Sequence, residues 1–489
     1  MSGYLSFVRT ERRFLAFGVV VALSSSFGQT FFVSLFAKQL KAAFELSNSD
    51  YGGLYSLATL CSAACLTWAG RKLDLVDLRV FAAVIAVALA AACFGMALVP
   101  TAAVLGVVFF GLRLFGQGLM SHTAMTSMAR YYEGRRATAM SVASMGFAIG
   151  EGVLPLVVLS ALGGLDWRTL WGINGVVLLA LQVPLVAWLL RGHGERHAAF
   201  EARTTSESVS PQPVGGKPER LSREGEGASE RPPMEPGEGA SERLPESVSP
   251  QPVGGEPERL SREGEGASER PPMEPGEGAS ERPPENRPKQ WTRGEVLRDP
   301  VFYALLPAVL CNGFVLTGVF FHQIFLIEEK GWSEELLGIS FVVFAGVRVS
   351  ASLLTGPWVD RLGSVRLLPT FLIPLWLGLA AVAVGDHPAA LIALFVGSGL
   401  SIGYGANVVG AMWADVYGVV HLGAIRSLAT AVAVFATSLS PFLLGKAFDL
   451  GLSVEWVFRA LAGYVGGATL LVLAASLILR RRAAGSLAA

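Results

Sequence analysis

The chain has 489 residues, of which 52% are hydrophobic and only 16% are charged. Soluble domains carry about 25% charged residues, so this composition is typical of a protein that lies largely in a membrane. The formal net charge is zero and no basic patch with interleaved aromatic residues occurs, which argues against a nucleic-acid partner. All four cysteines lie inside apolar runs, so we expect neither a disulfide framework nor a metal site.

The N-terminal segment predicts a membrane span and not a cleavable signal peptide. Arg9, Arg12 and Arg13 precede the apolar run Phe14–Ala37. This run is too long for the apolar core of a signal peptide, and no small-residue cleavage site follows closely behind it. We therefore expect the first spanning helix here.

Twelve apolar stretches are long enough to cross a bilayer, which takes about 20 mostly apolar residues. They predict an all-α membrane protein with twelve transmembrane helices in two pseudo-symmetric six-helix bundles, residues 1–195 and 299–489. The first six are Phe14–Ala37, Tyr51–Gly70, Val80–Val99, Thr101–Met128, Ala137–Leu162 and Leu170–Leu190, and the second six are Val301–Ile327, Leu336–Gly356, Leu367–Val384, Ala389–Met412, Leu422–Leu444 and Val454–Leu479.

The distribution of lysine and arginine over the loops predicts the orientation, because cytoplasmic loops are enriched in both. With the N-terminus inside, the predicted inner loops and tail hold more basic residues than the outer loops. We expect both termini in the cytoplasm and the protein in a bacterial inner membrane. The inner set is Arg71, Lys72, Arg79, Arg130, Arg135, Arg136, Arg361, Arg366, Arg426 and Arg480–Arg482, and the outer set is Lys38, Lys41, Arg168, Lys330, Lys446 and Arg459.

Residues 196–298 predict a disordered cytoplasmic linker between the bundles. Its Glu201–Gln290 part is rich in Glu, Arg, Pro, Gly and Ser and nearly free of aromatic residues, so it cannot bury enough apolar surface to fold. A 39-residue segment that begins at Glu207 recurs from Glu246 with two substitutions. Repeats of this composition lack the apolar positions that a solenoid stacks, which favours a flexible, Pro-stiffened linker. A docking segment for a partner is the alternative.

The two predicted bundles share sequence features in the same order. "GLRLFGQG" in the first corresponds to "GLSIGYGA" in the second, and "WAGRKLDLVDLR" corresponds to "TGPWVDRLGSVR". Such internal symmetry implies a pseudo-two-fold axis along the membrane normal, with a cavity between the halves.

These motifs resemble the major facilitator superfamily over nearly all of the chain except the linker. The loop motif of that family reads G-x-x-x-D-R-x-G-x-x-R, and in the second half it is matched in full. The stretches "SFGQTFFVSLF", "GVFFHQIFLIEEKGWS" and "RYYEGRRATAMSVASMGFAIG" are similar to the monocarboxylate and oxalate–formate branch. The matching residues are Gly356, Asp360, Arg361, Gly363 and Arg366, with Gly70, Asp74 and Arg79 as a partial match in the first half.

The resemblance implies that these loop residues form a gate. Asp360 is placed to accept hydrogen bonds from the N-terminus of the helix that starts near Ala137, where the helix dipole is positive. Asp74 would mirror this contact near Arg426, and Gly356 would let two helices approach closely. The alternative is an ordinary charged loop that follows the positive-inside rule.

Three ionisable residues lie at mid-depth of predicted spans, where charge is costly and usually functional. Two of them are cations, Arg113 and Arg348, and one is an acid, Glu151. The net positive charge favours an anion, and arginine suits a carboxylate through two parallel hydrogen bonds. We expect Arg348 to bind a substrate carboxylate, with Arg113 as a further substrate-binding candidate. We also expect Arg113 to pair with Glu151, which can take a proton. In the alternative, Arg113 bonds backbone carbonyls of the first helix and Glu151 only neutralises it.

Further polar residues on the predicted spans are substrate-binding candidates: Gln29, Asn312, His322, Tyr404 and Asn407. The alternative for each is a hydrogen bond between helices. Two residues depart from the eukaryotic monocarboxylate carriers, which have an acid where Phe344 stands and a first-helix lysine near Phe31.

The sequence thus predicts a secondary transporter, monomeric in the lipid bilayer, that moves a small carboxylate by alternating access with protons as a possible coupling ion. Efflux of amphipathic compounds is one alternative, although Glu151 follows Gly150 where drug antiporters have proline. A transporter-like sensor is another. No metalloprotease, Walker or Rossmann motif occurs, so we expect neither an enzyme nor a cofactor.

Overall fold

The computed structural model describes residues 2–74, 76–132, 135–200, 290–418 and 420–485. These described residues form helices, turns and short connections, without a strand among them. The tandem repeat lies outside the described residues. At the edges of the predicted linker, however, residues 193–200 are helical and a short helix, α13 (Arg293–Val296), precedes the second half.

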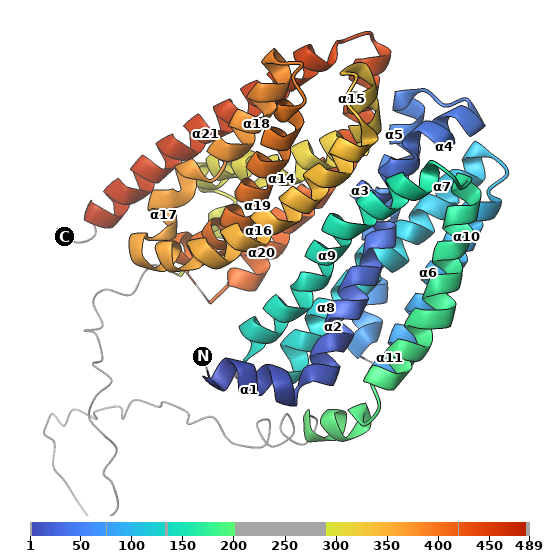
Figure 1. Ribbon diagram of the computed structural model, residues 1–489. Coiled ribbons are helices and arrows are strands. Elements are labelled where there is room, and N and C mark those ends of the chain that lie inside the picture. The colour runs from blue at the N-terminus through green and yellow to red at the C-terminus, as the bar shows by residue number, and fades with distance from the viewer. Residues whose placement is uncertain (1, 75, 133–134, 201–289, 419, 486–489) are drawn as a thin grey trace, which may run out of the picture. The chain divides into compact units, whose positions relative to one another are not determined.

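The first half contains six long helical passages (Figure 1). They follow the short helix α1 (Ser2–Thr10). The passages are α2 (Arg12–Ser24), η1 (Ser25–Gly28), α3 (Thr30–Val33), η2 (Ser34–Phe36) and α4 (Ala37–Phe44); α5 (Asn48–Ala69) with η3 (Gly70–Asp74); α6 (Leu78–Leu98); α7 (Ala102–Gly111), η4 (Leu112–Met120) and α8 (Ser121–Tyr131); α9 (Arg136–Leu162); and α10 (Trp167–Val177), η5 (Leu178–Gln182) and α11 (Val183–Leu189).

The second half repeats this organisation with six further passages. They are α14 (Pro300–Phe321) with α15 (Gln323–Glu329); α16 (Glu334–Leu362); α17 (Ser364–Leu367), η7 (Leu368–Thr370) and α18 (Ile373–Val384); α19 (Ala389–Tyr417); α20 (Leu422–Asp449); and α21 (Val454–Gly485).

Ten helices in the described part are long and apolar enough to span a bilayer, and one bent pair makes an eleventh span. The remaining predicted span corresponds to α5, which has sufficient length at 22 residues but carries many hydroxyl side chains. Its buried face includes Tyr51, Tyr55, Ser56, Thr59 and Ser62, and it packs against α20. A helix whose polar face packs on other helices can be this polar, because that face does not contact lipid.

The first span differs from the continuous helix predicted for Phe14–Ala37. It bends by 47° between Arg12–Gly28 and Thr30–Phe44 and continues as far as Phe44. Gln29 at the bend has extended backbone angles, φ −83° and ψ 154°. Gly28 lies against the backbone of η4, where a Cβ would come within 2.8 Å of the Gly116 Cα. The close contact of these two backbones accompanies the break in the helix.

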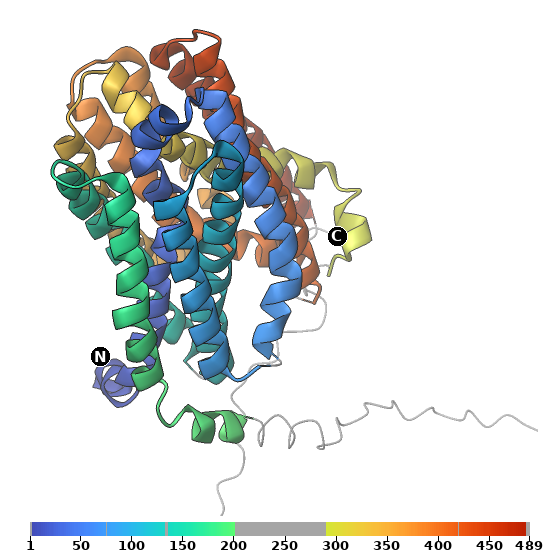
Figure 2. The same cartoon turned by 90° about the vertical axis from the view of Figure 1, so that its right-hand side faces the viewer.

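The two halves are joined at the end of the molecule that carries α4 and α15, which we call the far end. The opposite end, which carries α1, is the terminal end, and Figures 1 and 2 show both. Gln323 donates to the Phe31 carbonyl and to Ser34 Oγ, each at 3.0 Å. Lys38 pairs with Glu328 of the other half at 2.7 Å.

Asp449 provides a further contact between the halves at the far end. Its carboxylate accepts the backbone N–H groups of Asn48 and Ser49 at 3.0 and 2.6 Å. These two residues begin α5, so the acid of one half caps a helix of the other. Beside this contact, Tyr55 packs on Phe321 with ring centroids 4.6 Å apart.

Candidate functional site

A cavity of about 390 Å³ lies between the halves, where the internal symmetry of the sequence predicts one. Two arginines and several hydroxyl and amide side chains line it, and no acidic residue does. The first half contributes Thr59, Arg113 and Gln117, and the second half contributes Val309, Val409, Trp413, Arg426, Ala429, Thr430, Ala433, Val434 and Thr437.

Arg113 enters this cavity from η4, a π-helical segment within the fourth passage. Such segments are rare and are frequently found at functional sites. Its Nη1 donates to Tyr55 Oη at 2.9 Å, to Thr30 Oγ1 at 3.4 Å and to the Gly28 carbonyl at 3.5 Å. The guanidinium also lies 5.1 Å from the centre of the Tyr55 ring.

The charge of Arg113 is not neutralised by any residue that the structure describes. The residue is only 6% exposed, and its Nε has no hydrogen-bond partner. No carboxylate of the described residues pairs with it. The predicted pairing with Glu151 is therefore wrong for this structure, and the bond to the Gly28 carbonyl fits the alternative that the sequence left open. Every contact that orients this guanidinium comes from an uncharged group.

Glu151 instead binds Arg348 of the opposite half. Arg348 Nη1 donates to the Glu151 carboxylate in a direct ion pair between α16 and α9. Glu151 is 8% exposed, whereas the side chain of Arg348 is 30% exposed. The two helices pack closely here, since a Cβ on Gly152 would lie 3.1 Å from the Ala345 Cβ. The arginine that the sequence favours as the substrate ligand is thus compensated in this structure.

Arg426 is the charged cavity residue that reasoning from sequence missed. It is exposed to the cavity from the second turn of α20. The loop-charge pattern assigns it to an inner loop, although it lies inside the predicted span Leu422–Leu444. A basic residue one turn inside a span, and not before it, is the signal that could have identified it.

The other polar candidates form hydrogen bonds within their own halves, and none of them lines the cavity around Arg113. For all of them except Gln29, whose partner lies four residues earlier in the same span, this arrangement fits the alternative of a hydrogen bond between helices. Gln29 donates to Ser25 Oγ at 3.2 Å, Asn312 exchanges hydrogen bonds with Ser401, His322 lies 2.9 Å from the Pro441 carbonyl, Tyr404 lies 2.8 Å from Thr370 Oγ1, and Asn407 donates to the Ser352 carbonyl at 2.7 Å.

The second-half gate motif lies at the terminal end of α16. Asp360 and Arg361 are exposed in the last turn of this helix, and Asp360 makes no hydrogen bond or ion pair within the described part of the chain. Gly363 ends the helix with φ +80°, a conformation that favours glycine. Arg366 is exposed beyond it, and its carbonyl accepts from Arg480 at 3.4 Å.

Two expectations for the gate are not met in this structure. Asp360 does not contact the start of α9, because the halves are held together at the far end instead. Gly356 does not provide a close approach, since a Cβ there would meet only Asn407 Nδ2, at 3.9 Å. The cross-half capping predicted for Asp360 is instead made by Asp449 at the far end.

In the first half the gate residues have local surroundings. Gly70 begins η3 beside His122. Arg79 pairs with Asp77 at 3.2 Å. The side chain of Asp74 lies outside the described part of the structure.

Comparison with known proteins places the fold. No curated protein is similar enough in sequence to count as a match. A bacterial homologue of the human lysosomal transporter Spinster, solved inward-facing and unoccupied, shares 15% identity with a TM-score of 0.52, over 97% of this chain and 96% of that one. The xylose transporter XylE from E. coli, solved in an inward open conformation, shares 13% identity with a TM-score of 0.58, over 95% of each chain.

The fold of two six-helix bundles is confirmed by these similarities together with the helices described above. Residues 18–350, well over half of the chain, match the family model described as Major Facilitator Superfamily. This match covers the first half, the linker and the start of the second half. The chain is a multi-pass membrane protein that acts in transport and not as an enzyme, and it belongs to the Major Facilitator Superfamily.

Proposed function

We propose that this transporter carries a small organic carboxylate, and that Arg113 is its principal ligand. The observation that supports this proposal is the buried, uncompensated guanidinium of Arg113 in a cavity between the halves. Leaving a charge unpaired away from water is strongly unfavourable. A bound anion removes that cost, because a carboxylate can accept two parallel hydrogen bonds from one guanidinium.

The rest of the cavity fits the same kind of solute. Arg426 adds a second positive charge, and no acid lines the cavity to cancel it. The volume of about 390 Å³ is near the lower limit of about 300 Å³ for small-molecule sites, which favours a small solute. Gln117, Thr59 and Thr430 offer hydrogen bonds to its uncharged polar groups. An amphipathic drug would place apolar surface against both cations, so efflux of such compounds is disfavoured.

The pair of Glu151 with Arg348 is our candidate for proton coupling. It joins the halves directly, so its state affects how they separate. Protonation of Glu151 would neutralise its carboxylate and release Arg348, which could then accept the substrate carboxylate. The proton on Glu151 and the anion at Arg348 would then be bound at the same time and carried together, as symport requires.

We further propose that the terminal end faces the cytoplasm of a bacterium. The loop arginines described above support this orientation. The far-end contacts then close the outer side, and the cavity belongs to a state that loads or releases substrate inside. In the opposite state Asp360, which has no partner among the described residues here, would reach the start of α9 and close the inner side.

Uptake by the purified protein in proteoliposomes tests the proposal. The panel should contain radiolabelled mono- and dicarboxylates with a neutral sugar of similar size, each with and without a pH gradient. We expect saturable uptake of at least one carboxylate, no uptake of the sugar, and stimulation by an inward proton gradient. Uptake of the sugar but of no carboxylate would exclude an anion carrier. Carboxylate uptake that does not change with the pH gradient would exclude only the proton-coupling step.

A further inference from the structure

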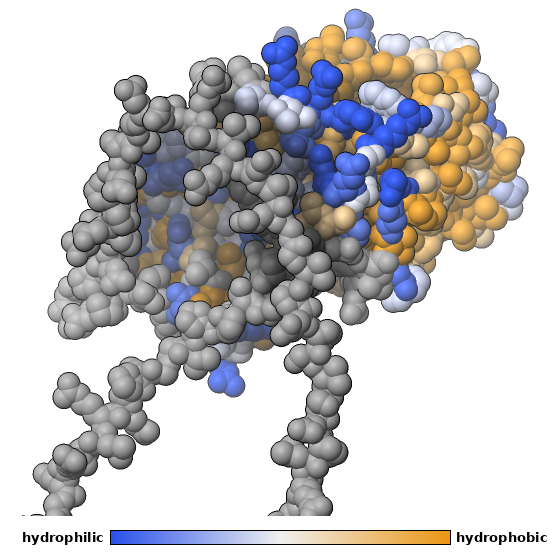
Figure 3. All heavy atoms as spheres, turned by 90° about the horizontal axis from the view of Figure 1, so that it is seen from below, coloured by the Kyte–Doolittle hydropathy of each residue, from blue (hydrophilic) through white to orange (hydrophobic). Residues whose placement is uncertain are grey.

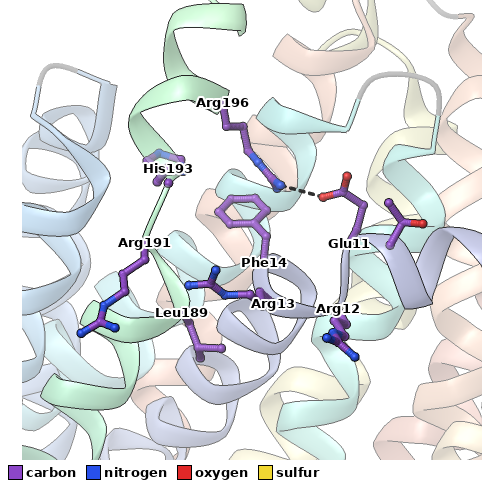
Figure 4. Close-up of a pocket in the computed structure, with 10 residues that line it drawn as sticks. Glu11, Arg12, Arg13, Phe14, Leu189, Arg191, His193 and Arg196 are labelled. Carbon is purple, nitrogen blue, oxygen red and sulfur yellow. Dashed lines mark hydrogen bonds and ion pairs between the residues drawn. The ribbon is translucent and has the colours of Figure 1, made fainter.

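A second pocket, of about 280 Å³, lies at the terminal end of the first half, away from the cavity between the halves. It is formed by the start of α2 and the turn that follows α11. Figure 4 shows three arginine side chains around Phe14 and Leu189, with a fourth held by Glu11. The three are Arg12, Arg13 and Arg191.

The charges in this pocket are unbalanced. Arg196 is neutralised by Glu11 at 2.7 Å. Glu11 is the single acid among the lining residues, so four arginines against one glutamate leave three positive charges. Arg12 and Arg191 are exposed and make no hydrogen bond or ion pair within the part of the chain that the structure describes. Arg13 donates to the Trp188 carbonyl at 2.6 Å and lies 5.2 Å from the centre of that indole ring.

His193 also lines the pocket and has unused hydrogen-bonding groups. It is 3% exposed, and neither ring nitrogen has a hydrogen-bond partner among the residues that the structure describes. Its ring is held by stacking on Phe14, with centroids 5.5 Å apart, and by an edge contact with Tyr131 at 4.9 Å. Buried polar groups in proteins are nearly always hydrogen-bonded, so two free nitrogens at a basic pocket indicate a missing ligand.

The pocket lies where a spanning helix meets the water. The span Trp167–Leu189 ends directly before it, and the same passage exposes Leu181, Leu185 and Trp188 along its length. Tryptophan is enriched at the membrane–water boundary, where phosphate headgroups lie. Figure 3, which views the molecule from this side, shows hydrophilic residues gathered beside a hydrophobic flank. A lipid in contact with the exposed flank of this passage would hold its phosphate beside the arginines.

We propose that this pocket binds a phosphate group, and that the group belongs to the headgroup of an anionic membrane lipid. Arg12, Arg13 and Arg191 supply charge and N–H donors to the phosphate oxygens, as basic pockets at helix ends do for acidic headgroups. His193 supplies a further N–H donor from the floor of the pocket. The fatty-acyl chains lie along the exposed side chains of α11 and η5.

Lipid retention by the full-length protein tests this proposal independently of transport. The protein is purified from vesicles of equal parts phosphatidylcholine and phosphatidylglycerol, and bound lipid is counted by native mass spectrometry. The variant carries Arg12→Gln, Arg13→Gln and Arg191→Gln together. The control carries Arg293→Gln, Arg480→Gln and Arg481→Gln, which remove the same charge from exposed sites in the second half.

We expect the wild type and the control to retain phosphatidylglycerol in preference to phosphatidylcholine. The variant should bind phosphatidylglycerol on the order of a hundredfold more weakly, because each arginine near a membrane surface contributes roughly a fivefold factor. His193→Phe keeps the ring contacts but removes both nitrogens, and we expect a loss of about fivefold for one hydrogen bond. If the triple variant fails to fold, Arg191→Gln alone should still weaken binding about fivefold.

A second measurement separates the two sources of phosphate. The unfolding temperature of delipidated protein is followed with inorganic phosphate and, separately, with phosphatidylglycerol in micelles. If phosphatidylglycerol stabilises the wild type but not the triple variant, the phosphate belongs to a lipid headgroup. Stabilisation by inorganic phosphate alone would overturn the lipid source and keep the phosphate site. Equal lipid retention and equal response to phosphate in the wild type and the triple variant would overturn the proposal altogether.

Discussion

Arg113 and Arg348 occupy similar depths in opposite halves of the molecule and have opposite surroundings. Tyr55, Thr30 and a backbone carbonyl hold Arg113 in place without cancelling its charge, whereas Arg348 is cancelled by Glu151. The first is therefore available to an anionic solute, and the second is part of a contact between the halves. Depth in the membrane identifies a charge as functional, but only its partners indicate which function it has.

The largest expected effect comes from removing the uncompensated charge. Arg113→Gln should weaken carboxylate uptake about ten- to a hundredfold, the range expected for losing hydrogen bonds from a charged group. Arg113→Lys keeps the positive charge but loses the planar pair of N–H donors. Its uptake should lie between that of the wild type and that of Arg113→Gln. Initial uptake rates over a range of substrate concentration measure both effects.

Arg9→Gln is the matched control, because Arg9 is exposed on α1 and lies outside the cavity. It should transport as the wild type does. Uptake by Arg113→Gln at the wild-type rate, with equal amounts of protein in the vesicles, would remove Arg113 from the site.

The compensated charge should behave differently. Glu151→Gln leaves Arg348 without its partner, and Arg348→Gln leaves Glu151 without its own, so each single variant should unfold at a lower temperature than the wild type. The double variant should recover part of that loss, because it leaves no buried charge without a partner. The expected coupling free energy between the two residues is about 1 to 2 kcal/mol. Thermal unfolding in detergent measures the cycle.

The same variants test the coupling role of this pair. Uptake by Glu151→Gln should no longer respond to a proton gradient, while exchange of labelled for unlabelled substrate continues. Additive single and double variants, or a Glu151→Gln protein that still responds to the gradient, would show that the pair is an incidental contact.

A smaller effect is expected where uncharged and charged groups together close the far end. Asp449→Ala removes the cross-half cap of α5. It should make the closed state of the far end about 1 kcal/mol less stable relative to the open state, which raises the open population about fivefold. Ser34→Cys reports that shift, because Ser34 is fully buried where it donates to the Phe320 carbonyl of the other half at the far end. Labelling by a membrane-impermeant thiol reagent should be about fivefold faster in the Asp449→Ala background, with Cys61 and Cys65 replaced.

Asp386→Ala is the control for this experiment, because Asp386 lies at the far end but pairs with Lys330 of its own half. Its labelling rate should match the parent protein. An Asp449→Ala rate that also matches the parent would show that the cap does not hold the halves together.

The smallest expected effect concerns the pH dependence of stability at the terminal end. Burial lowers the pKa of His193 to about 4, below its usual 6.5. The unfolded chain therefore takes up this proton between pH 6.5 and 4 while the folded chain resists it, so stability falls as pH falls through that range. His193→Phe should flatten this part of the curve of unfolding temperature against pH, and exposed His387→Phe should not. Parallel curves for all three proteins would contradict the assignment.

Hydropathy and loop charge were sufficient to predict the helical architecture, because each span must satisfy its own backbone in lipid. They could not predict the break at Gln29, which accompanies a contact with Gly116 far along the chain. In α5 the structure has a helix where the sequence predicts a span, but the helix is too polar to count among the candidate spans of the described residues. Its hydroxyl groups on the buried face contact other helices, which hydropathy alone does not predict.

For the candidate site, the sequence predicts the charged residues but not how they pair. The sequence identified Arg113, Glu151 and Arg348 as mid-depth charges, but it assigned Glu151 to the wrong arginine. The pairing depends on which faces of α9 and α16 meet, and helical spacing within one half carries no information about the other half. The contact of Asp449 could not be predicted for the same reason, because its partners are backbone groups about 400 residues away in the other half.

Tyr55 connects the cavity to the closed far end through a single side chain. Its hydroxyl accepts from Arg113, and its ring lies on Phe321 of the other half. A solute that draws the guanidinium away from this hydroxyl therefore acts on the same ring that helps to hold the far end closed. Thermodynamic reciprocity then requires that any change that loosens Tyr55 from Phe321 alters solute affinity by the factor by which the solute alters opening.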